Sequence, residues 1–378
     1  MQRLASFLHA SQQSAISQRP KLSQNGPPVN PAGQGAPDFN SDKDATRSHL
    51  AVNEQFYVDD LSVQGSFASE RIRLLRINPS EHLTPISCHF LTSSLQNHPD
   101  YDALSYCWGS QLTSQLCTIT VDDRAGFYVT KHLLQALRRL RSKDRFRFVW
   151  VDAICINQSS LLERNHQVQA MRQIYSHAHT VVVWLGELDE SQPSCERHLS
   201  APDCDHDVCA EPGLSAVEHG NVATILREKL AADKQKSLLR SSFGEVYWKR
   251  IWVLQEFAAS RSLPIVYLGP HAVRWQFFAD VLWDKHDHPF SHLRSEKRNS
   301  LYGLLRTTYN SFYSTDPRDK IFALLGLAEQ SEEICITPDY AKSIIEVHEE
   351  TMYYLLRTEQ TLDGNGVIFR LGCQIFLK

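Results

Sequence analysis

Carboxylate, amide and guanidinium side chains gather in one short segment that directly follows a bulky apolar run. Asp152, Asn157 and Gln158 come first, and Glu163 and Arg164 complete the segment. A carboxylate can stabilise a developing positive charge, and an arginine can hold a phosphate through two parallel hydrogen bonds. A helix that begins here would add an anion-binding N-terminus. The segment therefore has the side chains for chemistry on a phosphorylated ligand.

Three interpretations of this polar segment remain open. In the first, the segment is structural: Asp152 and Asn157 tie the loop by accepting backbone N–H groups, and Glu163 completes a capping box with Ser160. In the second, the segment binds a ligand or a protein partner. In the third, it is a catalytic site with Glu163 as its carboxylate.

The surrounding pattern predicts a β-loop-α-β unit. Residues 148–151 and 181–185 are bulky and contiguous, as in strands that are buried on both faces. Between them, apolar residues recur at helical spacing from Val168 to Ala178. Two parallel strands need a crossover of about this length. Because ligands collect at the carboxyl ends of strands in open α/β sheets, we expect the polar segment at a binding edge.

Further elements extend this unit to a doubly wound, mostly parallel α/β sheet with flanking helices. The pattern predicts a first core strand at 102–109, a hairpin at 119–129 and a helix with Thr130 as its N-cap. The remaining expected elements are helices near 222–237, 246–259 and 343–356 and a short strand at 264–268.

One of these predicted helices carries a second set of candidate site residues. Glu256 is its carboxylate, and Gln255 precedes it. Trp248 and Trp252 are one helical turn apart, so they could stack a base or pack in the core. Arg250 lies between them in the sequence.

Cysteine and metal chemistry receive little support from the spacing. Cys155 would need a base such as His166 to act as a nucleophile, and a buried inert thiol is the alternative. The nine cysteines are irregularly spaced, which indicates reduced thiols in an intracellular, cytoplasmic protein. A local Cys/His cluster matches no paired zinc motif, so no metal site is predicted. Its members are Cys195, His198, Cys204, His206 and Cys209.

Four blocks of the sequence resemble the fungal heterokaryon incompatibility (HET) domain family, in the expected order. They read YDALSYCWG at 101–109, FVWVDAICINQ at 148–158 continuing to VVVWLG at 181–186, YWKRIWVLQE at 247–256 and DPRDKIFALLGL at 316–327. The resemblance covers roughly residues 67–327. It adds further motif residues to the candidates above, namely Ser105, Tyr106, Trp108, Gly109, Trp184 and Gly186.

The resemblance implies an effector of programmed cell death in fungal non-self recognition, switched on by a protein partner or by self-association. The HET domain has been proposed to be remotely similar to TIR domains, many of which cleave the glycosidic bond of NAD with one glutamate. That likeness makes NAD a candidate substrate, with no further cofactor expected, and it follows the logic of carboxylate-assisted glycoside cleavage. Glu163 ranks ahead of Glu256 because it begins a helix after a strand-end loop. A non-catalytic scaffold is the alternative.

Composition suggests how the chain is organised. Residues 1–52 are rich in Ser, Gln, Pro, Gly and Asn and are predicted to be a disordered tail. Basic residues are sparse there, so mitochondrial targeting is not expected. Residues 67–260 should form the HET domain, with a loop insertion at about 189–220. Residues 261–378 should form a mainly helical extension that ends abruptly, as in a truncated chain.

Charge and hydropathy narrow the choice of partners. The net charge of −4 gives no reason to expect nucleic-acid binding. No apolar run reaches the roughly 18 residues that a membrane helix needs, so no membrane span is expected.

Overall fold

The computed structural model describes eight parts of the chain. They are residues 49–59, 61, 71–108, 116–187, 245–269, 271–282, 300–328 and 336–358. The predicted loop insertion, the helix near 222–237, the Cys/His cluster and the first 48 residues of the predicted tail lie outside them. Residues 49–54 are helical, and Asn53 exchanges hydrogen bonds of 2.7 and 2.9 Å with the backbone of Tyr128. Regular structure therefore begins before residue 52.

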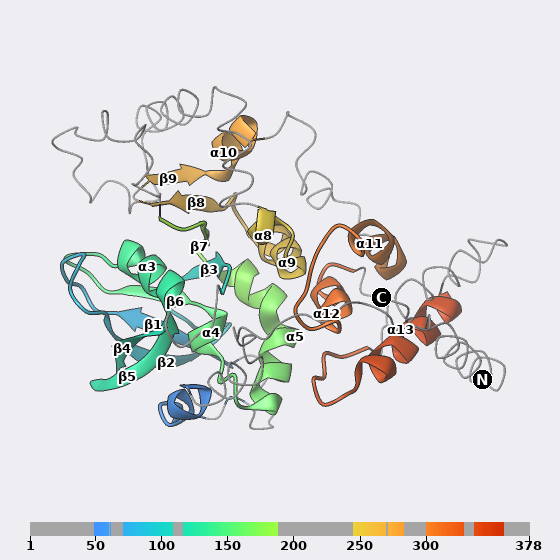
Figure 1. Cartoon of the computed structure of the whole chain (residues 1–378), viewed down its shortest axis with the longest axis horizontal. Coiled ribbons are helices and arrows are strands. Elements are labelled where there is room, and N and C mark those ends of the chain that lie inside the picture. Colours follow the sequence, from blue (N-terminus) through green and yellow to red (C-terminus); the bar gives the residue numbers. More distant parts are fainter. Residues whose placement is uncertain are drawn as a thin grey trace, which may run out of the picture. The chain divides into compact units, whose positions relative to one another are not determined.

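The described part of the chain contains one nine-stranded sheet, and helices pack against it (Figure 1). The strand order is β5-β4-β2-β1-β6-β3-β7-β8-β9. In chain order the strands are β1 Arg71–Ile77, β2 Ser87–Ser94, β3 Asp102–Tyr106, β4 Leu116–Val121, β5 Arg124–Thr130, β6 Arg147–Trp150, β7 Thr180–Trp184, β8 Ile265–Leu268 and β9 His271–Arg274. The helices are α3 Lys131–Leu140, α4 Asp152–Cys155, α5 Leu161–His177, α8 Glu245–Trp248, α9 Ile251–Ala259, α10 Trp275–Leu282, α11 Leu301–Thr308, α12 Asp319–Leu325 and α13 Ile344–Thr358.

The sheet is mixed, which corrects the expectation of a mostly parallel sheet. Parallel pairing occurs in the block β6-β3-β7-β8 and in a short contact between β2 and β4. Strand β1 runs antiparallel to both β2 and β6, and the hairpins β4-β5 and β8-β9 are antiparallel. For the pairs β1-β2, β4-β5 and β8-β9 the reason is connection length, because strands that follow each other through a short connection pair in the antiparallel sense. The antiparallel pairing of β1 with β6, which is distant in the sequence, is a result of tertiary packing. Strands β1 and β2 also precede the first strand that the sequence pattern predicts.

The parallel block contains a reversal of strand order. The chain enters it at β3, continues to β6 on one side of β3, and then to β7 and β8 on the other side. In open α/β sheets, ligands bind outside the carboxyl ends of the strands at such a switch point. In this protein that place lies at the ends of β3, β6 and β7.

The predicted helix starts at residues 131 and 161 are confirmed. The Thr130 side chain accepts a hydrogen bond from the first turn of α3, and the Ser160 side chain does the same for α5. The predicted hairpin at 119–129 corresponds to β4 and β5. Its turn residues Asp122 and Asp123 have φ angles of 48° and 61°, in the left-handed region that Asp tolerates better than most residues.

The helix predicted at 246–259 is interrupted in the structure. Helices α8 and α9 are separated by Lys249 and Arg250, where Ile251 N–H donates to the Tyr313 carbonyl at 2.9 Å. Arg250 has the extended backbone of an N-cap. The interruption therefore comes from a tertiary contact with a residue about 60 positions away in the sequence.

The C-terminal region is mainly helical in its described part, and it also contributes two strands to the sheet. Strands β8 and β9 lie beyond residue 260 and extend the sheet next to β7. Helix α12 packs against α9, and α9 packs against α5. Helix α9 is therefore packed against an element from beyond residue 260.

A backbone and a side chain approach each other closely at Gly326, the C-cap of α12. A β-carbon added there would lie 2.8 Å from Gln255 Cδ and 3.3 Å from Arg172 Cβ. We expect Gly326→Ala to lower the free energy of unfolding by about 1–3 kcal/mol, as overpacking does. Chemical denaturation measures the change. The control Gly303→Ala, whose added carbon meets only Ser300 Oγ at 3.5 Å, should not destabilise the protein. Equal stability of Gly326→Ala and the wild type would contradict the close approach.

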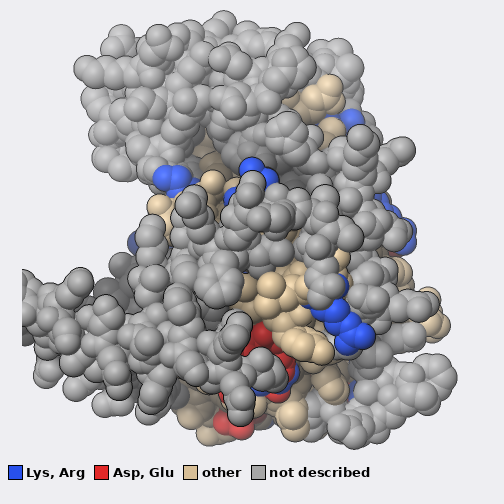
Figure 2. Space-filling model, turned by 90° about the vertical axis from the view of Figure 1, so that its right-hand side faces the viewer, with Lys and Arg blue, Asp and Glu red and all other residues tan. Residues whose placement is uncertain are grey.

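The surface drawn in Figure 2 carries charges of both signs. Acidic side chains gather in one area of this face, whereas lysine and arginine side chains are dispersed. Across the described ranges, no helix has both the length and the apolar character required to span a bilayer.

Candidate functional site

A buried polar cluster lies at the carboxyl end of β3. The Ser105 hydroxyl is 2.5 Å from the Tyr247 hydroxyl and donates a hydrogen bond to the Glu256 carboxylate. Because Ser105 has one proton to donate, the Tyr247 hydroxyl donates to Ser105. All three side chains are buried. The partners of Ser105 are 142 and 151 residues away in the sequence, so only folding assembles the cluster.

Arg250 borders this cluster and connects it to β3. One of its nitrogens donates to the Tyr106 carbonyl, and another lies 3.9 Å from a Glu256 oxygen. The Arg250 side chain is 21% exposed, whereas that of Glu256 is 2% exposed. Solvent therefore reaches the cluster from the arginine side.

Burial and neighbouring charges shift the pKa values of Glu256 and Arg250 in opposite directions. Burial raises the pKa of Glu256 above the ordinary value of 4.5, while Arg250 and the Ser105 hydrogen bond lower it. Burial also opposes the charge of Arg250, but Glu256 and other neighbours raise the pKa of Arg250 above its usual range. Arg250 is therefore a permanent cation, and the charge of Glu256 depends on its contact with Arg250 and Ser105.

Asp152 follows the end of β6 and interacts electrostatically with Arg250. Its carboxylate accepts hydrogen bonds from the Trp108 indole at 2.9 Å and from Ala153 N–H at 2.7 Å. Its backbone carbonyl accepts the Gln158 side-chain amide at 2.9 Å. Burial raises the pKa of Asp152, and Arg250 lowers it. Asp152 and Trp108 are only partly buried, so they form the more open side of the site.

Aromatic side chains complete the ends of β3 and β7. Tyr106 and Trp184 are buried, and the His132 ring lies 6.0 Å from Tyr106 and 6.1 Å from Trp184, between centroids. His132 Nδ1 is 2.8 Å from the Cys107 carbonyl. Burial lowers the pKa of His132. At neutral pH the ring is therefore uncharged, with its proton on Nδ1 and an acceptor lone pair on Nε2.

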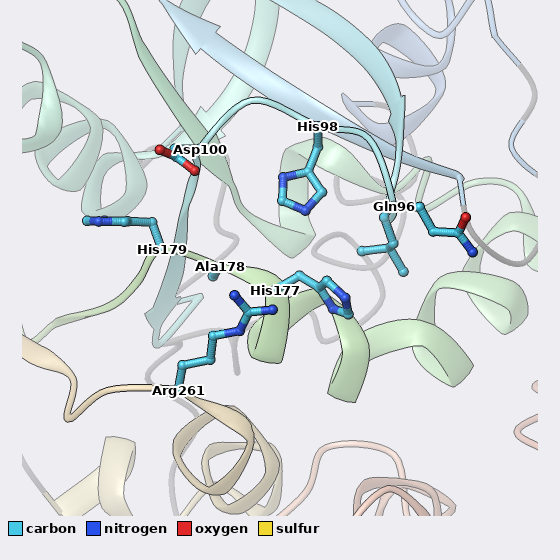
Figure 3. A pocket seen from close by; sticks show the side chains of 8 residues that line it. Gln96, His98, Asp100, His177, Ala178, His179 and Arg261 are labelled. Atoms are coloured by element: carbon cyan, nitrogen blue, oxygen red, sulfur yellow. The ribbon is translucent and has the colours of Figure 1, made fainter.

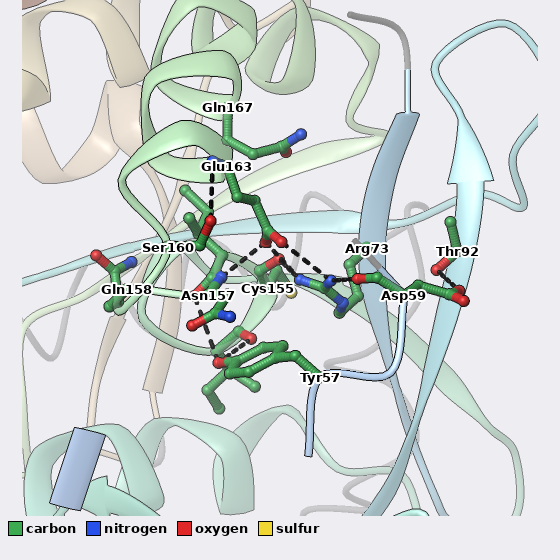
Figure 4. A network of polar contacts seen from close by, with 12 residues as sticks. Tyr57, Asp59, Arg73, Thr92, Cys155, Asn157, Gln158, Ser160, Glu163 and Gln167 are labelled. Carbon is green, nitrogen blue, oxygen red and sulfur yellow. Dashed lines mark hydrogen bonds and ion pairs between the residues drawn. The ribbon is translucent and has the colours of Figure 1, made fainter. Parts of the chain in front are cut away.

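Glu163 lies in a different place, in a buried ion pair with Arg73 (Figure 4). The shortest distance between the two is 2.6 Å, and each side chain is 1% exposed. The second Glu163 oxygen accepts from Arg73 at 3.3 Å, and the first also accepts Asn157 N–H at 2.7 Å. The expected capping box is only half formed, because Ser160 N–H donates to the Asn157 carbonyl and not to Glu163. Both Glu163 oxygens are thus occupied by protein donors.

The Arg73 guanidinium also contacts other parts of the chain around this ion pair. It donates to the Cys155 carbonyl at 2.9 Å and to the Asp59 carbonyl at 2.6 Å. It also lies over the Tyr57 ring, 4.7 Å from its centroid. The residues before β1, the strand β1 and the polar segment therefore meet at one buried cation.

The Cys155 thiol is buried and protonated at neutral pH. Val151 N–H donates to its sulfur at 3.4 Å, and burial raises the pKa of Cys155 to about 12. The thiolate, not the thiol, is the nucleophile, so this environment favours an inert thiol. The four described cysteines, Cys88, Cys107, Cys117 and Cys155, are free.

The C-terminal region engages two other predicted site residues. The Arg164 guanidinium lies 4.0 Å from the Tyr340 ring centroid, and Trp252 is a neighbour that lowers the pKa of Asp319. The Tyr340 hydroxyl donates to Asp319 at 2.6 Å. Burial raises the pKa of Asp319 to about 6, although its neighbours Tyr340 and Trp252 oppose that rise. Arg164 and Trp252 therefore lie against the extension and not with Ser105 and Glu256.

The remaining motif residues have mainly packing positions. Trp248 is buried, with its ring 5.1 Å from that of Trp275, and Gln255 is buried on α9. Gly186 follows β7 with φ of 114°, a conformation that favours glycine. Gly109 lies outside the described residues.

A separate pocket opens near the amino ends of β3 and β7, at the opposite edge of the parallel block (Figure 3). Its polar lining includes His98, Asp100, His177, His179 and Arg261. In Figure 3 the His98 ring and the Arg261 guanidinium point into it. Throughout the described residues, no three His, Cys, Asp or Glu side chains are placed to hold a metal ion together.

Several residues of the site were not expected from the sequence. Arg73 is one of three arginines in β1, so its residue type alone does not single it out as a buried, paired charge. Tyr247 and Asp319 lie inside recognisable blocks but without a spacing that would connect them to a partner. His132 and Tyr340 are single residues, and no local pattern identifies their role.

Comparison with known proteins confirms the resemblance on which the sequence interpretation depends. Residues 101–256 match the family model described as heterokaryon incompatibility protein (HET). The chain is also similar to heterokaryon incompatibility protein 6, OR allele, of Neurospora crassa, with 28% identity over 370 residues, covering 75% of this chain. It spans about half of that relative, 51% of its length. No solved structure matches the chain.

Proposed function

We propose that this chain is an effector of fungal incompatibility, which arrests or kills the cell by hydrolysing NAD at the carboxyl ends of β3, β6 and β7. The HET match and the name of the Neurospora relative support the biological role. The observation that carries the chemical role is the Glu256 carboxylate, placed by Ser105 and Arg250 at a switch point of the sheet. A trigger by a protein partner or by self-association in the cytoplasm belongs to the same proposal.

The proposed reaction is cleavage of the bond between the nicotinamide nitrogen and C1′ of the ribose. The electron pair of that bond leaves with the nicotinamide, which departs uncharged, and positive charge develops on the ribosyl ring. Water adds to C1′ and loses a proton, giving ADP-ribose. An ionised carboxylate beside the ring stabilises this cationic transition state.

Geometry favours Glu256 over Glu163, which reverses the ranking made from the sequence. The Glu163 oxygens are held by Arg73 and by Asn157 N–H, so a substrate would have to displace a buried cation. Glu256 is bonded to a neutral hydroxyl, and Arg250 is 3.9 Å away. Rearranging these contacts of Glu256 costs less free energy than breaking the buried ion pair of Glu163.

The neighbours of Glu256 could bind the other parts of a dinucleotide, its pyrophosphate and a base. Arg250 is cationic and partly exposed, so it can meet the pyrophosphate. The Trp108 indole is partly buried and fixed by Asp152, so its face can stack on a base. The strand order β6-β3-β7-β8 follows the 2-1-3-4 sequence of flavodoxin-like sheets, which supports the proposed TIR-like reading of the parallel block.

The burial of Glu256 suggests how the effector is kept inactive before it is triggered. Its carboxylate is 2% exposed and hydrogen-bonded to Ser105, so a ribose reaches it only after a local rearrangement. We propose that clustering or partner binding favours the open arrangement. A ligand can shift such an equilibrium only by binding the open state better.

The test is incubation of the purified full chain with NAD, alone and under forced clustering through a fused oligomerisation domain. We expect slow release of nicotinamide and ADP-ribose by the free chain and a clear increase on clustering. Both products are measured by chromatography. If a clustered chain that arrests a fungal host releases no nicotinamide above background, the enzyme proposal is wrong and a non-catalytic effector remains.

A further inference from the structure

The pocket at the amino ends of β3 and β7 is built from three separate segments of the chain (Figure 3). They are the segment before β3, the junction of α5 with β7, and the residue that follows the C-cap of α9. Each segment contributes a side chain that is a cation or can become one, namely His98, His177 and Arg261. The cavity has a volume of about 570 Å³, which lies within the usual range of sites for small molecules.

Backbone carbonyls fix two of the histidine rings. His98 Nδ1 is 2.9 Å from the Pro99 carbonyl, and His177 Nδ1 is 2.8 Å from the Gln173 carbonyl. A carbonyl can only accept a hydrogen bond, so Nδ1 carries the proton in both rings and Nε2 is the atom left for a ligand. The two ring centroids are 6.1 Å apart. Protonation of these rings therefore converts two neighbouring lone pairs into two hydrogen-bond donors.

Arg261 supplies a positive charge that does not depend on pH. Its side chain is exposed, and its guanidinium points into the pocket (Figure 3). Within the ranges that the structure describes, it makes no hydrogen bond or ion pair with another residue. Asp100 is the single carboxylate of the pocket lining. The pocket therefore has an excess of positive charge once its histidines are protonated, although the whole chain carries a net charge of −4.

The end of α5 is arranged so that it opposes a bound anion less than a free helix end would. The last carbonyl groups of a helix carry partial negative charge, which disfavours a nearby anion. The Ile174 carbonyl accepts hydrogen bonds from the Tyr101 hydroxyl at 2.6 Å and from Ala178 N–H at 3.2 Å. The Gln173 carbonyl accepts the His177 ring. Protein donors thus occupy two of these carbonyls, and the same bonds hold Tyr101 and His177 in place before a ligand arrives.

We propose that this pocket binds a small anion that carries a phosphate group, with Arg261 as its permanent cationic contact and His98 and His177 as further donors in their protonated form. An arginine fork recognises a phosphate through two parallel hydrogen bonds. The concave shape favours a small molecule. Because the pocket lies at the opposite edge of the parallel block from Glu256, the inference does not depend on the proposed NAD chemistry.

Calorimetric titration of the full chain with inorganic phosphate, AMP and adenosine tests the site at about pH 6, where histidine side chains are largely protonated. We expect phosphate and AMP to bind and adenosine not to bind. Tighter binding of AMP than of phosphate would identify a nucleotide as the source of the phosphate group, and binding of phosphate alone would identify the free ion. Equal binding of AMP and adenosine, or no binding of either phosphate or AMP in large excess, would overturn the proposal.

Three single variants locate the bound phosphate. Arg261→Ala should weaken phosphate binding by about tenfold or more, because hydrogen bonds to a charged group are lost. Asp100→Asn removes the carboxylate of the lining and should tighten binding by about two- to fivefold, as expected for one exposed charge; unfolding cannot produce such a gain. The control Arg306→Ala removes an exposed arginine of α11 and should bind phosphate normally. Unchanged affinity in Arg261→Ala, or an equal loss in Arg306→Ala, would overturn the site.

Sulfate measures the contribution of the histidines, because its charge stays constant between about pH 5 and pH 8, where histidine titrates. The other charged and titratable groups that face the two rings are Asp100, Tyr101, His179 and Arg261. Of these side-chain types, only histidine changes its charge in this range. Sulfate should bind at least about tenfold tighter at about pH 5.5 than at about pH 8.

A double variant assigns this pH dependence to the two rings. In His98→Asn with His177→Asn, each amide can keep the bond to the backbone carbonyl but lacks the Nε2 donor. The affinity ratio between the two pH values should fall to about twofold, with His179 as the remaining histidine. A wild-type affinity for sulfate that does not change with pH, or a double variant that keeps the full ratio, would overturn the assignment of His98 and His177 as donors.

Discussion

In the Glu256→Gln variant, NAD cleavage by the clustered full chain is expected to fall by about 10³-fold, with KM nearly unchanged. The amide keeps the size of the side chain and can still accept the Ser105 hydrogen bond, so binding and folding are largely preserved. It removes the negative charge that would face the ribosyl cation, and charge stabilisation of this kind contributes about 10²–10³-fold or more to a rate. The expected loss is therefore in kcat, measured by nicotinamide release at saturating NAD.

A matched control distinguishes this role from a general effect of lost charge. Glu187 follows β7, at the same edge of the parallel block, and forms an ion pair with Arg139 at 2.8 Å. Glu187→Gln should retain most of the activity. Thermal unfolding of both variants shows whether the fold is intact. Full activity of Glu256→Gln would remove the catalytic role of that carboxylate, and loss of activity in both variants would indicate a less specific electrostatic effect.

The pH dependence of the wild type gives an independent check. Burial raises the pKa of Glu256, and the contacts with Arg250 and Ser105 only partly offset that rise. The ionised carboxylate is the active form, so kcat should fall as the pH falls through this raised pKa. The midpoint should lie above the ordinary glutamate value of 4.5. A kcat that stays constant to well below pH 4.5 would show that Glu256 is not the titrating group.

Glu163→Gln is expected to lower the free energy of unfolding by about 3–5 kcal/mol, the range for removing one partner of a buried ion pair. Arg73 and Glu163 are each 1% exposed and 2.6 Å apart. The variant leaves the Arg73 cation buried without a counter-charge. It also weakens the bond that Asn157 N–H makes to the carboxylate. Denaturant titration followed by circular dichroism measures the loss.

A double variant keeps this prediction testable if the single variant does not fold. Replacing both partners, as Arg73→Met with Glu163→Leu, removes the uncompensated charge and should cost less than Glu163→Gln alone. NAD cleavage per folded molecule should stay near the wild-type value, because the pair lies apart from Glu256. A loss below about 1 kcal/mol in Glu163→Gln would contradict the structural assignment.

The sequence by itself determined the features that depend on neighbouring residues. Thr130 and Ser160 were recognisable as helix caps because a cap bonds to a backbone group only three positions away. The strands at β6 and β7 followed from contiguous bulky residues, and the hairpin at β4 and β5 from its turn. The ordered blocks were enough to identify the resemblance to the HET family, which the match at residues 101–256 confirms.

Only the tertiary structure decided which surfaces meet. Glu163 and Arg73 are 90 residues apart, and Ser105 and Glu256 are 151 apart. Local spacing contains no information on such pairs, so the two candidate glutamates could be ranked only by their positions in the predicted elements. The antiparallel placement of β1 and the break before α9 have the same origin. Periodicity fixes which face of an element is apolar, but the partner of each polar group depends on how distant elements pack, because a buried charge is stable only where folding brings it a counter-charge or hydrogen bonds.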